Sequence, residues 1–195
     1  MARISVKSKA VDSYARRAAV ALLCCLVLLR PSTVLCEPVK GPEYEVKIGF
    51  IYNFANFVTW PPAVFDDNPD PLILCFVSEN LSSEVLYKLD GKSIKGRKIK
   101  VIAYRDGACL TKSHILFFAT QNKAIIQPIL NLANGLGILT IGEVDGFSRM
   151  GGVINFFEAS NRLRFEINID AARREGLKMS AQLLGSAQIV KAEKE

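Results

Sequence analysis

The sequence has few of the residues, histidine above all, that most catalytic and metal centres use. Its 195 residues include one histidine, one tryptophan and five cysteines. A single imidazole, that of His114, excludes any site that requires two or more histidines. Long hydrophobic runs are also missing, since the longest spans residues 18–29 and a membrane helix needs about 20 apolar residues. A helical membrane protein is therefore not expected.

Glycine and proline are too few for a collagen-like, disordered or low-complexity chain, at 13 and 8 residues. Half of the residues are hydrophobic and 23% are charged, which suits one folded domain with its own core.

The net charge of +6 is concentrated near the start of the chain. Residues 1–36 hold six basic residues and one acidic residue, whereas residues 37–195 hold 19 basic and 18 acidic residues. A nearly neutral domain gains little from neutralising phosphates, so a nucleic-acid partner is not predicted.

Residues 1–36 have the three parts of a secretory signal peptide: a basic stretch, the apolar run 18–29 and a short polar segment. Cleavage after Cys36 would place Val34 and Cys36 at the small-residue positions and leave a mature domain of residues 37–195. Two alternatives stay open. The apolar run could be retained as an anchor, or Cys36 could carry acyl chains, although Leu35 stands where that signal normally has a small residue.

Cysteine usage agrees with export. When Cys24, Cys25 and Cys36 leave with the leader, Cys75 and Cys109 remain. An even pair in an oxidising compartment favours one disulfide, with two buried free thiols as the alternative. Closing a loop of this length removes about 3.8 kcal/mol of unfolded-chain entropy in the chain-entropy model.

The pattern of apolar residues predicts an α/β fold. We expect a mixed, largely parallel central sheet with helices on both faces, ending in an antiparallel hairpin and a helix. The expected helices are 44–60, 82–91, 124–133, 171–175 and one from about residue 181 through 190, and the expected strands are 72–78, 98–104, 114–119, 138–144, 152–157 and 162–168. The last two strands are joined by the four-residue loop 158–161.

Local signals mark several helix ends. Pro61 and Pro62 should stop the first helix, and Asp170 and Ser180 should cap the last two helices. Gly176 suits a left-handed turn after residue 175.

The sequence contains no phosphate-binding glycine loop and no nucleophile elbow. Gly151 and Gly152 precede a strand rather than a helix, so they cannot present backbone amides to a phosphate. Cys109 and His114 could form a nucleophile and base, but a lone histidine that opens an apolar strand is more often structural. No catalytic residue, cofactor or metal is predicted.

Three acidic residues, Glu143, Asp145 and Glu158, could in principle supply a carboxylate pair for acid/base chemistry. They lie at strand ends and turns, where we expect solvated acids.

Two surface features are candidates for partner binding. One is a basic cluster, for which a solvated strand edge is favoured over a docking patch for an acidic partner; its members are Lys92, Lys95, Arg97, Lys98, Lys100 and Arg105. The other is Trp60 beside Phe54 and Phe57, for which core packing is favoured over an exposed aromatic anchor. The glycosylation triplet 80–82 arises readily by chance.

Several long segments resemble the YfiR family of exported bacterial proteins, across nearly all of residues 43–190. The most specific are YEVKIGFIYNFANFVTWPP at residues 44–62 and FEINIDAARREGLKMSAQLL at residues 165–184. The resemblance implies a periplasmic α/β protein that represses an inner-membrane diguanylate cyclase by binding its periplasmic sensor part. It also implies release by an outer-membrane lipoprotein or by a redox change.

Carried onto this chain, the disulfide of that family falls on Cys75 and Cys109. Some members have a second pair near a late turn, but this sequence has no cysteine after residue 109. The residues that bind the partner lie on variable surface and stay unassigned.

The sequence thus leads to a non-enzymatic periplasmic inhibitor that lowers cyclic-di-GMP and biofilm formation. The first rival hypothesis is a periplasmic module that binds a small ligand at the carboxyl ends of its strands and signals to a sensor kinase. The second is a thiol enzyme that uses Cys109 and His114, which requires a free thiol. Whether the protein forms a homodimer is left open.

Overall fold

The computed structural model describes residues 41–65, 71–79 and 83–191. The predicted leader, its three cysteines and the glycosylation triplet 80–82 lie outside the described residues. No helix in the described part of the chain is both long enough and apolar enough to cross a bilayer.

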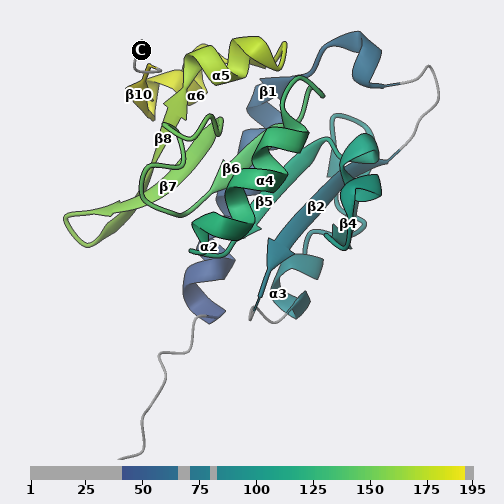
Figure 1. Ribbon diagram of the computed structural model, residues 1–195, viewed down its shortest axis with the longest axis horizontal. Helices are drawn as coiled ribbons and strands as arrows, with labels where there is room; N and C mark the ends of the chain where they lie inside the picture. Colours follow the sequence, from purple (N-terminus) through teal and green to yellow (C-terminus); the bar gives the residue numbers. More distant parts are fainter. Residues whose placement is uncertain (1–40, 66–70, 80–82, 192–195) are drawn as a thin grey trace, which may run out of the picture. The chain divides into compact units, whose positions relative to one another are not determined.

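Eight of the described strands form a mostly parallel sheet with the order β10-β8-β7-β6-β5-β2-β4-β3 (Figure 1). Only the pairs β3/β4 and β7/β8 in this sheet are antiparallel. Its strands are β2 (Leu72–Ser78), β3 (Ser93–Ile94), β4 (Arg97–Ala103), β5 (Ile115–Ala119), β6 (Leu139–Gly142), β7 (Ile154–Ala159), β8 (Arg162–Asn168) and β10 (Gln188–Val190). The predicted fold class is confirmed, including the closing antiparallel hairpin.

One face of the sheet packs against helix α2 (Gly41–Phe57), whose buried residues recur at helical spacing, as in Ile48, Ile51 and Phe54. Leu74 and Phe117 point to this face from the central strands. The short helices α3 (Ser83–Tyr87), α5 (Ile169–Arg174) and α6 (Ala181–Gly185) contribute to the same core.

The opposite face packs against the 3-10 helix η2 (Gly107–Lys112) and helix α4 (Lys123–Ala133). Because side chains alternate along a strand, Cys75 and Phe118 point to this side. Strand β5 is buried along its whole length, which explains why its sequence is an unbroken apolar run.

The first helix differs from its predicted span of 44–60. It begins at Gly41 and ends at Phe57, before the two prolines. The next two residues form strand β1 (Val58–Thr59), which pairs with β9 (Lys178–Met179) from the far end of the chain. The helix ends early because a distant segment supplies hydrogen-bond partners, as in the bond from Ser180 N to the Phe57 carbonyl at 3.0 Å.

The turn between β7 and β8 is shorter than the predicted four-residue loop. It consists of Ser160 and Asn161, which have φ angles of 52° and 58°. Positive φ at both central residues defines the tight hairpin turn that matches strand twist, and asparagine tolerates it well.

Helix caps are partly as predicted. Ser180 caps α6, its side chain accepting from Leu183 N, and Gly176 adopts φ 66°. The cap of α5 is Asn168 rather than Asp170, because the helix begins two residues earlier and Asn168 accepts from Ala171 N at 2.9 Å.

The final helix is also shorter than predicted. It ends at Gly185, and β10 follows at Gln188–Val190 as a parallel neighbour of β8. The backbone of β8 offers a ladder of hydrogen-bonding groups, which favours an extended chain over a further helical turn.

Gly142 at the end of β6 and Gly152 shortly before β7 leave space for an aromatic ring. The ring of Phe147 lies fully buried between Gly142 and Gly152. A methyl group added at Gly152 would stand 2.0 Å from this ring, and one added at Gly142 would stand 2.4 Å from it. Both positions therefore require the absence of a side chain.

We predict that Gly152→Ala lowers the free energy of unfolding by about 1–3 kcal/mol, because the ring must move within a packed core. Gly49→Ala is the matched control, since Gly49 is an exposed position of helix α2 and nothing lies within 4 Å of its added methyl group. This control should raise the free energy of unfolding by roughly 0.5–1 kcal/mol through helix propensity. Urea denaturation measures both values, and equal stability of the two variants would contradict the packing role.

Candidate functional site

Two groups of polar contacts lie at the carboxyl ends of the parallel strands, one around Glu79 and one around Glu143. The connections from β2 and β5 leave toward opposite sides of the sheet, and ligands of open α/β sheets bind at such a switch point. There Thr120 donates to a carboxylate oxygen of Glu79 at 2.6 Å, and Asn122 donates to the other oxygen at 3.3 Å. Glu79 therefore joins the ends of β2 and β5.

Glu143, just after β6, lies at the centre of a buried polar cluster. Tyr44 donates to one of its carboxylate oxygens and Lys47 to the other, both at 2.6 Å. Lys47 also pairs with Glu43, one helical turn earlier. Only 6% of the side chain of Lys47 and of Glu143 is exposed, so both charges are neutralised within the protein.

Burial and the hydrogen bond to Glu143 raise the pKa of the Tyr44 hydroxyl. Burial alone would lower the pKa of Lys47, but the carboxylates of Glu143 and Glu43 outweigh it and raise that pKa. The cluster is thus a protonated phenol and an ammonium group that share one carboxylate.

The expectation that all three candidate acids are solvated is wrong for Glu143. Asp145 and Glu158 are exposed, as expected. Glu143 differs because α2 brings a lysine and a tyrosine to the end of β6. Lys47 was the sequence feature that could have indicated a buried acidic partner. It lies four residues before the fully buried Ile51, on an apolar helix face.

A small pocket of about 170 Å³ opens beside this cluster. Its lining includes Lys47, Gln121, Phe157 and Leu163. Both carboxylate oxygens of Glu143 accept hydrogen bonds from side chains of α2, so the cluster joins α2 to the sheet.

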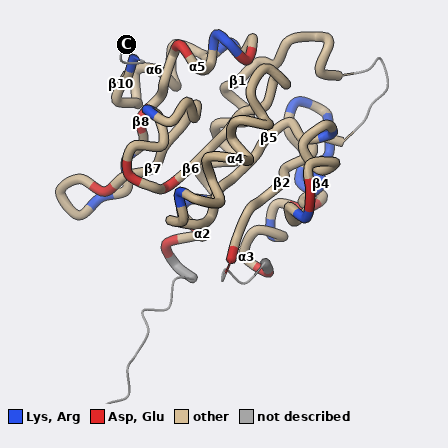
Figure 2. Tube along the Cα trace, in the orientation of Figure 1, with Lys and Arg blue, Asp and Glu red and all other residues tan. Residues whose placement is uncertain are grey.

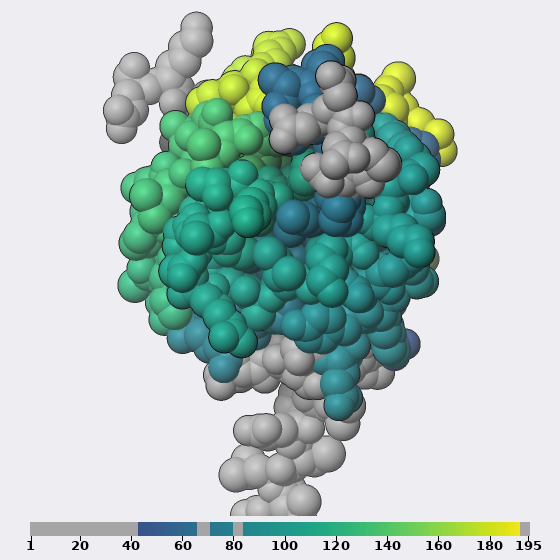
Figure 3. All heavy atoms as spheres, turned by 90° about the vertical axis from the view of Figure 1, so that its right-hand side faces the viewer, coloured from purple at the N-terminus to yellow at the C-terminus, as the bar shows by residue number. Residues whose placement is uncertain are grey.

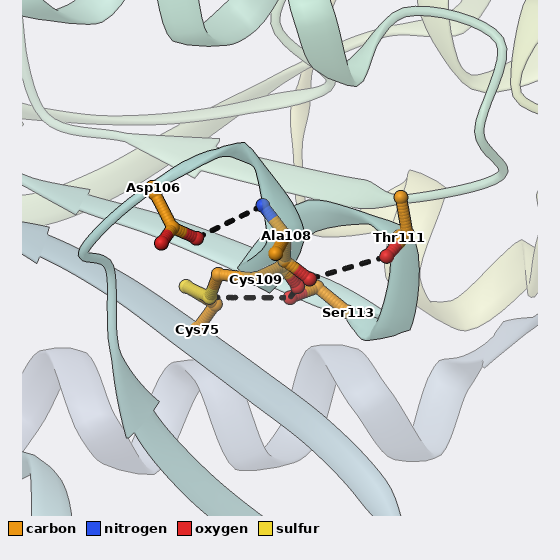
Figure 4. Close-up of a disulfide and its surroundings, with 6 residues drawn as sticks. All are labelled: Cys75, Asp106, Ala108, Cys109, Thr111 and Ser113. Carbon is orange, nitrogen blue, oxygen red and sulfur yellow. Dashed lines mark hydrogen bonds between the residues drawn. A yellow bond between two sulfur atoms is a disulfide. The ribbon is translucent and has the colours of Figure 1, made fainter.

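A disulfide joins Cys75 on β2 to Cys109 in η2, with 6.9 Å between their Cα atoms (Figure 4). Asp106 caps η2 by accepting from Ala108 N at 3.0 Å, and Ser113 donates to the Cys109 carbonyl at 2.7 Å. The disulfide anchors the segment between β4 and β5 to the central strand β2. Cys109 therefore carries no free thiol in this structure, in contrast to what the thiol-enzyme hypothesis requires.

His114 has structural contacts at the amino end of β5. Its Nδ1 accepts from Ile73 N at 3.0 Å, and its ring stacks on Phe65 with 4.6 Å between centroids. Trp60 donates to the His114 carbonyl at 3.0 Å and is 6% exposed. Trp60 thus packs in the core, as favoured, and the hypothesis of an exposed aromatic anchor is wrong.

A larger pocket of about 560 Å³ lies at the amino ends of β2 and β5. Phe65, Ile73, Lys112, His114 and Leu136 are among its lining residues. The small-ligand hypothesis placed its site at the carboxyl ends, whereas the larger of these two pockets is at the opposite edge.

The basic cluster lies along β3 and β4, where Figure 2 shows Lys and Arg gathered at one side of the sheet. Lys95 donates to the Val58 carbonyl at 2.6 Å, and the Arg97 guanidinium lies 4.1 Å from the centroid of the Phe65 ring. The segment just before β4 contains the short strand β3, which pairs with β4.

Within the described ranges, no group of three or more His, Cys, Asp or Glu side chains is placed to hold a metal ion.

Most of the chain matches a known protein family. The model of a family described as YfiR/HmsC-like matches residues 44–188. The chain has no match among curated proteins. Among solved structures, it is similar to the ABC domain from Streptococcus pneumonia in complex with L-Trp, with a TM-score of 0.47 and 11% sequence identity. That alignment covers 75% of the present chain and 60% of the other.

We predict that Glu143→Gln lowers the free energy of unfolding by about 3 kcal/mol, because the buried ammonium of Lys47 loses a charged partner. The matched control is Glu45→Gln, whose partner Lys88 is more than half exposed. This control should cost less than about 1 kcal/mol. Chemical denaturation of both variants at neutral pH measures the difference. Equal losses of unfolding free energy would show that the buried ion pair stabilises the fold no more than the exposed one.

We also predict that Cys75→Ser lowers the free energy of unfolding by about 2–5 kcal/mol and reduces the yield of exported protein. Adding Cys109→Ser to this variant should change stability little further, because the bond is already lost. Melting curves of the single and double variants test this. A melting temperature of the Cys75→Ser protein equal to that of the unaltered protein would contradict a stabilising disulfide.

Proposed function

The chain belongs to the YfiR/HmsC-like family, and we propose from this that it is a periplasmic, non-enzymatic repressor of an inner-membrane diguanylate cyclase. It binds the periplasmic part of the cyclase, holds the enzyme inactive, and so lowers cyclic-di-GMP and biofilm formation. An outer-membrane lipoprotein is the expected competitor for the repressor.

The extent of the family match carries this proposal. The matched residues 44–188 run from helix α2 to the first residue of β10 and include both cores of the described domain. The likeness therefore concerns the whole fold and not one shared motif. The family is one of regulators of diguanylate cyclase signalling.

The positions of Cys109 and His114 support a non-enzymatic role. The Cys109 sulfur is bonded to Cys75, and the His114 ring accepts from the backbone of β2. A thiolate nucleophile and an imidazole base would each need to give up these contacts.

The disulfide also supports export, because such bonds persist in oxidising compartments such as the periplasm. The leader 1–36 would deliver the chain there, and the domain 37–195 would act after its removal.

Repression requires only differential affinity for two states of the cyclase. To shift the receptor from 99:1 to 1:99 in favour of the inactive state, the protein must bind that state about 10⁴-fold more tightly, or about 5.5 kcal/mol. A rigid surface with a few well-buried contacts can supply this difference.

One observation favours a second candidate function, a periplasmic module that binds a small ligand and signals to a sensor kinase. The pocket of about 560 Å³ has the volume of ordinary ligand sites and is lined by both polar and apolar residues. A ligand that copurifies with the protein in native mass spectrometry would support this alternative.

Deletion of the gene is expected to raise cyclic-di-GMP and biofilm, because the cyclase loses its repressor. Restoring the full chain should return both to their original levels, and a chain that lacks residues 1–36 should not, since it stays in the cytosol. Mass spectrometric measurement of cyclic-di-GMP in extracts tests this.

The control is the same deletion in a strain whose candidate cyclase is catalytically inactive, where no rise is expected. Unchanged cyclic-di-GMP after deletion would contradict the proposal. Full restoration by the leaderless chain would contradict its periplasmic site of action.

A further inference from the structure

Six basic residues in and beside the β3–β4 hairpin lie at one edge of the sheet, and we call this group the basic edge. It consists of Lys92, Lys95, Arg97, Lys98, Lys100 and Arg105. In the described sheet β3 is the outermost strand on this side. Figure 3 views the molecule from this side, where the teal atoms of this part of the chain lie at the surface.

Strand alternation directs two of these lysines outward. Ile99 and Val101 are buried in the core beneath α2. Lys98 and Lys100, which alternate with them on β4, are exposed. Their spacing of two residues along a strand places the two ammonium groups on the same face.

The basic edge carries a large local excess of charge. Residues 88–106 include seven basic and two acidic residues, a net charge of +5. The rest of the domain 37–195 has twelve basic and sixteen acidic residues, a net charge of −4. An interaction through this edge therefore cannot be a consequence of the charge of the whole domain.

Three of the cations are available to a partner. Lys98 and Arg105 are exposed and form no ion pair among the described residues. Lys100 lies 3.8 Å from Asp90, but its side chain is 59% exposed, so this pair is weak. Lys95, by contrast, is held by the Val58 carbonyl and belongs to the fold.

The composition of the edge favours a lipid surface over an acidic protein. Protein interfaces are rich in aromatic residues and arginine and poor in lysine, whereas four of these six cations are lysines. None of the large hydrophobic side chains that the described residues expose belongs to residues 92–105; they are Val46, Tyr87, Leu132, Leu136 and Ile189. Each Lys or Arg near an anionic lipid surface adds to binding, so three exposed cations in one short segment favour such a surface.

We propose that the basic edge binds anionic phospholipid headgroups and lays the domain against a membrane surface. The inference adds to the proposed function, because a domain held at the inner membrane meets the periplasmic part of a membrane cyclase far more often. Lipid binding itself can be measured without any cyclase, so failure of one proposal is distinguishable from failure of the other.

The test compares three forms of the full chain, as purified from cells, in sedimentation with vesicles. The vesicles are phosphatidylcholine with about one-third phosphatidylglycerol, at about 50 mM salt. The first variant combines Lys98→Gln, Lys100→Gln and Arg105→Gln. Each cation near an anionic surface contributes roughly fivefold to binding, so the loss of three should weaken binding by about 100-fold relative to the unaltered chain.

The matched control combines Arg162→Gln, Arg164→Gln and Arg173→Gln, which removes the same charge from exposed positions on β8 and α5. It should bind as the unaltered chain does, and binding of both should fall at about 500 mM salt. Melting curves verify that both variants are folded.

Three results would overturn the proposal. The first is equal loss of binding in the two variants, which would indicate adsorption by net charge. The second is equal binding by all three forms. The third is binding of the unaltered chain to a poly-glutamate peptide but not to the vesicles, which would identify the edge as a docking site for an acidic protein.

Discussion

Burial of the central strands on both faces is the constraint on which the rest of the structure depends. Leu74 and Phe76 of β2 face helix α2, while Cys75 and Val77 face α4 and η2. Strands covered on both sides are mostly apolar along their length, because an unpaired polar group is costly to bury. The charged cluster around Glu143 accordingly lies just after the end of β6.

An ion pair and a disulfide, each between residues far apart in the chain, hold the covering helices against the sheet. The Lys47–Glu143 pair joins α2 to the end of β6, and the disulfide joins η2 to β2 on the other side of the sheet. Both are buried contacts between a layer and the sheet rather than within a layer. They suit a protein whose proposed task is to present a rigid surface to a receptor, since a rigid surface loses little entropy on binding.

The uneven distribution of charge complements this rigidity. A nearly neutral domain with a local charge of +5 in residues 88–106 has a defined orientation in the field of a negative surface. The edge that carries this charge is also protected from pairing with other strands, because lysines at an exposed sheet edge discourage association. The same residues thus serve solubility and the proposed membrane contact.

The sequence by itself determined the elements whose signals are local. The apolar runs of β2 and β5, the alternation of Leu163, Phe165 and Ile167 in β8, and the capping of α6 by Ser180 follow from the residues in each segment. Tertiary structure alone decided the short strands β1 and β10, which exist because distant backbones offer hydrogen bonds. It also decided the burial of Glu143, because an isolated carboxylate stays in water unless a cation is brought to it, and Lys47 lies 96 residues away in the chain.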